Sequence, residues 1–210
     1  MNDTEIYILE SIKKWVWSGY YLPDGVHEML DDILEEEVDE SAMRQAIDSE
    51  FARKAEEEQA WPSVTDCDRI DSVFLKLDKS GICACQNAGY TMSEGYSDVT
   101  EALVNRGKHK YQGYCFFHGQ DIERAIEGHG LSVAFGDLND VVEKMIDVGH
   151  SVKQALEEAG FEVEWDGTAD TRLNISKINW QRRYLPTQQT SPQPTTPQPT
   201  SKKAWWQFWQ

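Results

Sequence analysis

The alternation of helical and strand patterns between residues 61 and 184 is the feature that most constrains the fold. In this stretch, apolar residues at helical spacing are interrupted by short apolar runs that are typical of buried strands. The expected strands are 82–86, 112–118, 131–135, 161–165 and 171–176, with 178–184 closing the sheet. The Asp166-Gly167 pair favours an antiparallel hairpin near the end of this stretch. The pattern therefore predicts an α+β domain with a mixed sheet of about five strands.

Polar residues at suitable positions mark where helices should begin. The expected caps are Asp24, Asp39, Thr65 and Thr91. Glu94 follows Thr91 by three residues, which is the spacing of a capping box. A short helix is expected over 121–127, where Gln120 and Asp121 are both suitable caps, and a long one that stops at Gly160.

The N-terminal segment, residues 1–60, is acidic and has the pattern of helices. It holds 17 acidic and 5 basic residues, and its apolar residues recur at helical spacing until Ala60-Trp61-Pro62 ends the pattern. We expect it to pack on the domain of residues 61–184. The runs 35–37 and 56–58 are all glutamate, and we interpret them as solvated faces that disfavour anionic partners.

The C-terminal segment differs from both. Residues 185–203 form a linker rich in proline, threonine and glutamine, in which Pro-Gln-Pro-Thr occurs twice. Residues 204–210, here called the tail, contain four aromatic side chains that are predicted to bind a partner protein: Trp205, Trp206, Phe208 and Trp209. The sequence leaves open whether the tail docks on its own chain or on another one.

Charge and composition exclude several classes of protein. The formal net charge of -17 argues against binding to duplex nucleic acid, because phosphate contacts need a basic face. No apolar run is long enough to span a membrane, and the first residues lack the pattern of a signal peptide, so we expect a cytoplasmic protein. The four cysteines form no CxxC pair and are expected to be reduced and buried. No motif indicates a cofactor.

Two polar turns follow expected strands and are the candidates for a small-molecule site. His118 and Asp121 lie between a strand and a helix, and they are the candidate catalytic residues. Four neighbours are candidate ligand-binding residues: Asn87, Tyr90, Gln120 and Arg124. If the two strands are parallel, both turns lie at one edge of the sheet, where ligands commonly bind. The alternative is that these polar residues form no ligand site and serve only as helix caps.

Two charged clusters are weaker candidates. Asp66, Asp68 and Asp71 crowd the start of one helix, where carboxylates gain from free backbone amides, and they are also candidate ligands for a metal ion. Basic and aromatic residues gather between Arg172 and Tyr184, where they could bind a single strand of nucleic acid or pair with the protein's own acids.

Several long motifs in the middle domain resemble a known family. They are VTDCDR at 64–69, QNAGYT at 86–91, GYCFFHGQD at 113–121 with ERA at 123–125, and VEWDGT at 163–168. Over residues 61–183 the chain resembles a bacterial family catalogued as a domain of unknown function, with His129 and His150 as departures from its pattern. The resemblance implies a cytosolic bacterial protein of α+β fold, and it implies no activity.

Two classes of function remain. The first is a protein-interaction or regulatory module that docks through the tail or the acidic face. The second is a small enzyme or ligand-binding domain that uses His118, Asp121, Asn87 and Tyr90. Because no catalytic motif is present, the sequence favours the first class.

Overall fold

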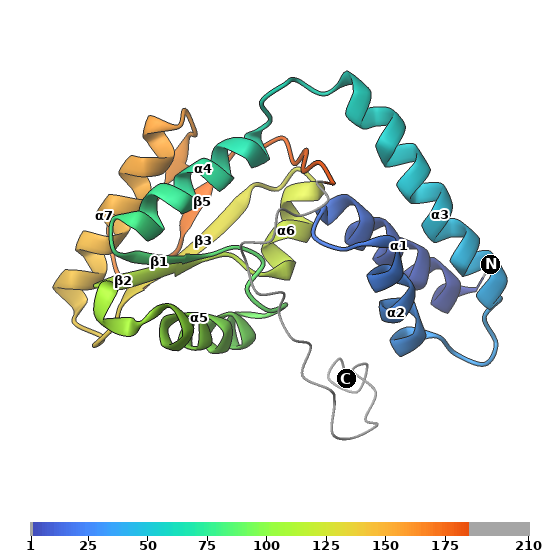
Figure 1. Ribbon diagram of the computed structural model, residues 1–210, viewed down its shortest axis with the longest axis horizontal. Coiled ribbons are helices and arrows are strands. Elements are labelled where there is room, and N and C mark those ends of the chain that lie inside the picture. The colour runs from blue at the N-terminus through green and yellow to red at the C-terminus, as the bar shows by residue number, and fades with distance from the viewer. Residues whose placement is uncertain (1, 185–210) are drawn as a thin grey trace.

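The computed structural model describes residues 2–184, in which seven α-helices accompany a five-stranded sheet (Figure 1). Three helices come first: α1 (Asp3–Ser18), α2 (Pro23–Ile33) and α3 (Glu40–Glu57). The body follows, with α4 (Asp66–Lys79), β1 (Ile82–Cys85), α5 (Met92–Arg106), β2 (Gly113–Phe116), α6 (Gly119–Ile126), β3 (Leu131–Asp137), α7 (Val142–Glu158), β4 (Val163–Glu164) and β5 (Leu173–Ile175). The predicted α+β class is confirmed. The linker and the tail lie outside the described residues.

Most of the expected caps form. Asp39 accepts a hydrogen bond from the Ala42 amide, and capping boxes close at Thr65 with Asp68 and at Thr91 with Glu94. Asp24 as a cap is wrong, because it lies inside α2. That helix begins at Pro23, whose fixed φ suits the first helical position.

The sheet is mixed, with strand order β1-β2-β3-β5-β4. β1 and β2 are parallel, and all other neighbouring pairs are antiparallel. Helices α4 and α7 pack on one face with Ile82 and Ala84, whereas Cys83 and Cys85 face α5 on the other. The two thiols therefore share a side of β1, because residues two positions apart in a strand lie on the same face.

The expectation of a strand over 178–184 is wrong. β5 already pairs with β3 on one side and β4 on the other, so it offers no free edge to a further strand. The segment instead lies against α1 and α4. Trp180 is buried and donates its indole N–H to the Ser18 carbonyl oxygen at 3.1 Å, and the Arg182 guanidinium binds Asp71. Side-chain burial replaces strand pairing as the force that holds this segment.

Helices α1, α2 and α3 share a small core of their own, which includes Ile8, Ile12, Leu30 and Ile47. This core is separate from the two cores that flank the sheet. Lys14 of α1 contacts the body, where its ammonium group lies 3.1 Å from Glu123 and 3.2 Å from Glu127 of α6. Among residues 2–184, no helix has the length and apolar character needed to cross a membrane.

Candidate functional site

The turns after β1 and β2 lie side by side, because their strands are parallel neighbours that end at the same edge. Three backbone hydrogen bonds join the turns. The Ala88 amide donates to the Phe117 carbonyl at 3.0 Å, Gly119 to Gly89 at 2.9 Å, and Gln120 to Tyr90 at 3.2 Å. The structure therefore brings together the two polar segments that the sequence singles out.

His118 is the N-cap of α6, a position for which the sequence suggests Gln120 or Asp121. Its Nδ1 accepts from the Asp121 amide at 3.4 Å, and its Nε2 lies 3.2 Å from an Asp121 carboxylate oxygen. This arrangement fits the neutral tautomer that carries its proton on Nε2. His118 and Asp121 are both buried, at 3% and 1% exposure. Asp121 thus engages both ring nitrogens, which suits a structural pair better than a free general base.

Arg172 completes this cluster. The sequence places it only among the basic and aromatic residues between Arg172 and Tyr184, here called the basic strip. Its Nη1 lies 2.9 and 3.1 Å from the two carboxylate oxygens of Asp121, and 3.5 Å from His118 Nε2. Burial lowers the pKa of His118 below its ordinary value of 6.5, and the nearby Arg172 adds to this effect although Asp121 opposes it. The imidazole is therefore neutral at neutral pH. Since 51 residues separate Arg172 from Asp121, local spacing gives no signal of their contact.

The candidate ligand-binding residues divide into two groups. Asn87 has a left-handed backbone with φ 49°, and its side chain hydrogen-bonds to the Tyr21 hydroxyl. The Tyr90 hydroxyl hydrogen-bonds to Glu123. Gln120 is exposed, and Arg124 reaches the His129 carbonyl in the turn after its own helix, at 3.5 Å. Asn87 and Tyr90 therefore contact other elements, the connection between α1 and α2 and helix α6, whereas Gln120 is exposed and Arg124 binds its own turn.

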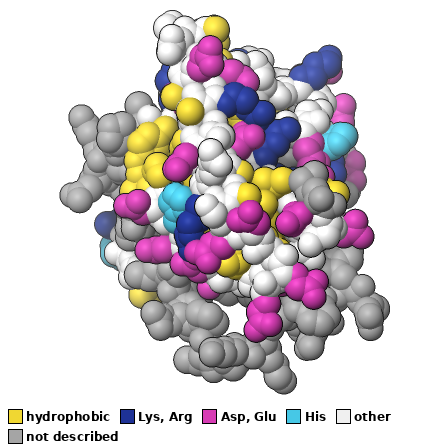
Figure 2. Space-filling model, turned by 90° about the vertical axis from the view of Figure 1, so that its right-hand side faces the viewer, with side chains coloured by type: hydrophobic (Ala, Val, Ile, Leu, Met, Phe, Trp, Pro, Cys, Tyr) yellow, Lys and Arg dark blue, Asp and Glu magenta, His cyan; other side chains and the backbone are white. Residues whose placement is uncertain are grey.

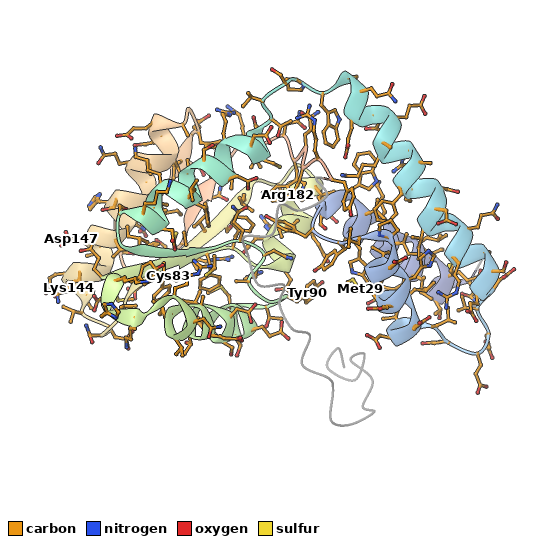
Figure 3. The ribbon with its side chains drawn as sticks, in the orientation of Figure 1. Met29, Cys83, Tyr90, Lys144, Asp147 and Arg182 are labelled. Carbon is orange, nitrogen blue, oxygen red and sulfur yellow. The ribbon has the colours of Figure 1, made fainter. Side chains whose placement is uncertain are left out.

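Residues of the N-terminal segment cover this edge of the sheet. The Tyr20 hydroxyl donates to Gln86 Oε1 at 2.9 Å, and Tyr21 reaches Asn87. Burial raises the pKa of Tyr20, so its hydroxyl keeps the proton that it donates. In Figure 3, Tyr90 and Arg182 lie along the boundary between the body and the N-terminal helices. The crevice where parallel strands commonly bind ligands is thus lined by the chain's own side chains.

The three candidate metal-binding aspartates each face a cation. Asp66 lies 2.6 Å from Arg69, Asp68 lies 3.5 Å from Arg183, and Asp71 binds Arg182. Within the described part of the chain, no group of three or more histidine, cysteine or acidic side chains is arranged to hold a metal ion. The aspartates of α4 therefore fasten the segment 178–184 to the body, and this role accounts for their clustering.

The basic strip is not a free cationic surface. Besides the pairs just described, Lys177 lies 3.0 Å from Glu162. Arg172, Arg182 and Arg183 all meet carboxylates, so the strip pairs with the protein's own acids. The acids that bind the three arginines come from α4 and α6, Glu162 lies between α7 and β4, and none of them comes from the N-terminal helices.

A family model described as "Domain of unknown function (DUF6891)" matches residues 1–184. The chain belongs to this family. The match extends the resemblance seen in the middle domain to the N-terminal helices, and it ends where the linker begins. No curated protein and no solved structure matches the chain significantly.

Two hollows on the surface of this DUF6891 domain lie away from the polar edge. One, of about 430 Å³, is lined by residues of α7 and the turn after β4, including His150, Lys153 and Trp165. The other, of about 350 Å³, lies between α1 and α3. The predicted partner-binding residues of the tail, from Trp205 to Trp209, fall outside the described residues.

Proposed function

We propose that this chain is a cytoplasmic protein-interaction module whose tail binds a partner protein. The observation that carries the proposal is the closure of the polar edge. Tyr20 and Tyr21 contact Gln86 and Asn87 in the turn after β1, and both ring nitrogens of His118 contact Asp121. The site best placed for small-molecule chemistry is therefore used internally, whereas four aromatic residues stand at the end of a 19-residue linker.

The tail supplies the kind of side chains that dominate protein interfaces. Trp205, Trp206, Phe208 and Trp209 can each bury a large apolar area, and tryptophan is enriched among residues that carry most of the binding energy. Residues 1–60 supply a net charge of -12. Such a surface speeds association with cationic partners and repels anionic ones. The proposed partner is thus a protein with an apolar groove and a basic surface.

A pull-down from a lysate of the source cell tests the proposal. The full chain is compared with a variant in which Trp205, Trp206, Phe208 and Trp209 are all alanine. The control variant carries Gln207→Ala and Gln210→Ala. These two substitutions lie in the same seven-residue tail and keep every aromatic ring. We expect one or more proteins to be retained by the full chain and the control but lost by the four-alanine variant. An identical set of retained proteins for all three forms would refute the proposal.

A ligand-binding domain or small enzyme is the second candidate, and Arg172 is the observation that favours it. Its side chain is 35% exposed beside the buried Asp121, so an anion could reach the guanidinium group. A thermal-shift screen of anionic metabolites against the full chain and the Arg172→Gln variant tests this function. A compound that stabilises the full chain but not the variant would support it.

A further inference from the structure

The hollow between α1 and α3 is apolar at its base and charged at its rim. Seven residues line it: Ile6, Leu9, Glu10, Ile12, Lys13, Ala46 and Glu50. Ile6 is 40% exposed although it is a large aliphatic residue. A concave apolar surface bordered by polar residues is typical of a docking site. We call this hollow the α1–α3 groove.

The net charge of residues 1–60 suits a cationic apolar peptide, although Lys13 adds one positive charge to the groove. Figure 2 shows acidic side chains distributed among hydrophobic ones on the side of the molecule that carries the N-terminal helices. Glu10 is exposed, whereas Glu50 already lies 2.7 Å from Arg53. The attraction therefore comes mainly from the net charge of -12 over residues 1–60 and not from one rim pair.

The C-terminal segment has the complementary composition. Residues 185–210 contain no acidic residue, and Lys202 and Lys203 immediately precede the tail. The tail itself offers three tryptophans and a phenylalanine within seven residues. Aromatic side chains gain most when they enter a desolvated pocket, and the groove is an apolar hollow of about 350 Å³.

The linker begins close enough to deliver the tail to the groove. Tyr184, the last described residue, donates its amide to Glu58 Oε1 at 3.2 Å, just beyond the C-terminal end of α3. Glu50 and Ala46 lie 8 and 12 residues before Glu58, which is about 12 and 18 Å along a helix. A linker of 19 residues spans about 25 Å as a flexible coil and at most about 59 Å as polyproline II, so in either form it is long enough to cover this distance. A linker matched to the span maximises the effective concentration of the tethered peptide.

We propose that the tail docks in the α1–α3 groove of its own chain. The inference builds on the proposed function, because the same aromatic side chains would bind the partner. Docking on the same chain means that a partner must compete with the groove. The apparent affinity for the partner is then the intrinsic affinity multiplied by the fraction of molecules whose tail is released.

A photo-crosslinking experiment on the full-length purified protein tests the inference. The crosslinking amino acid benzoylphenylalanine replaces Phe208, and the products are separated by mass before peptide mapping. We expect crosslinks from position 208 to residues of α1 and α3 in a product of monomer mass. The crosslink map is obtained from protein whose groove is unaltered. The primary result therefore does not depend on a groove variant that could misfold.

Two lysine variants test whether the crosslink depends on the α1–α3 groove. Ile6→Lys places a charge at the groove, and Leu75→Lys places one at another exposed aliphatic residue, on α4, which is 57% exposed. We expect Ile6→Lys to reduce the crosslink yield at least fivefold and Leu75→Lys to leave it unchanged. Circular dichroism confirms that both variants are folded.

Three outcomes would overturn the inference. Crosslinks to the surface of α4, α5 or α7 would place the tail elsewhere, and a crosslink found only at dimer mass would make a second copy the occupant. Absence of any crosslink would show that the tail is not docked. The crosslinking uses purified protein without a partner, whereas the pull-down measures partner binding. The two proposals can therefore be refuted separately.

Discussion

Arg182 and Asp71 are joined by two parallel hydrogen bonds, of 3.1 Å from Nη1 and 2.7 Å from Nη2. The guanidinium group also stacks on the Tyr20 ring, 4.4 Å from its centroid. Three parts of the chain thus meet at one side chain: the segment 178–184, helix α4 and the connection between α1 and α2. The pair, with the stacking on Tyr20, links the segment 178–184 and the connection between α1 and α2 to helix α4.

Replacing Arg182 with alanine should destabilise the fold by about 2 kcal/mol, since hydrogen bonds to charged groups contribute about 1.5–3 kcal/mol and Asp71 is partly exposed. Urea denaturation measures the change. Lys177→Ala is the matched control, because Lys177 is 82% exposed in its own ion pair and should contribute less than about 0.5 kcal/mol. Equal effects of the two substitutions would show that Arg182 does not join the segments.

His118 should make the fold less stable in mild acid. Burial lowers its pKa in the folded state below the ordinary value of 6.5, so the unfolded chain binds the proton first as the pH falls. Its contribution to stability is full above about pH 6.5 and declines below that pH. The variant His118→Asn keeps a capping side chain and removes the titration. Denaturation at pH 7.5 and pH 5.5 should show a larger loss of stability for the natural chain than for the variant. A difference between the two proteins that does not change with pH would contradict this assignment.

Two glycines in helices should respond oppositely to alanine. A Cβ atom at Gly95 of α5 would overlap the Phe116 ring, whereas at Gly25 of α2 it would meet nothing within 4 Å. Gly95→Ala should therefore cost about 1–3 kcal/mol through overpacking. Gly25→Ala should stabilise by up to about 1 kcal/mol, because alanine favours the helix. Thermal denaturation distinguishes the two. A neutral Gly95→Ala would mean that α5 does not pack closely on the sheet.

The thiols should react only when the body opens. Cys67, Cys83, Cys85 and Cys115 are all free and buried. Burial raises the pKa of Cys67 to about 12, whereas the hydrogen bond from Cys83, with the nearby Arg106, lowers the pKa of Cys85. Mass spectrometry after alkylation at low urea should find Cys85 labelled before Cys67. Rapid labelling of all four cysteines without urea would contradict the packing of both faces of the sheet.

The sequence predicts much of the fold because its signals are local. The capping boxes at Thr65 and Thr91 depend on residues three positions apart, and the pleat of β1 places Cys83 and Cys85 on one side. The segment 178–184 is the main error. Its alternating pattern resembles a strand, but the segment is held by side-chain contacts of Trp180 with Ser18 and of Arg182 with Asp71, which span 162 and 111 residues of sequence.

The candidate site is predictable only in part, because some of its contacts join residues that are far apart in the sequence. That the turns after β1 and β2 meet follows from the two strands being parallel neighbours. Closure of the edge by Tyr20 and Tyr21 depends on contacts across 66 residues, which leave no pattern in the sequence. The burial of Lys54, which lies 2.6 Å from Glu58, is likewise not apparent from the sequence, where Lys54 precedes the acidic run 56–58.

The central claim is that the aromatic tail binds a partner protein. The most direct measurement is a titration of a partner recovered by the pull-down against the full chain and against the four-alanine variant. Since one dominant anchor contributes about 2 kcal/mol or more, the account predicts that the variant binds at least about 30-fold more weakly. The Gln207→Ala and Gln210→Ala control should bind like the full chain. Equal dissociation constants for the full chain and the four-alanine variant would contradict the account.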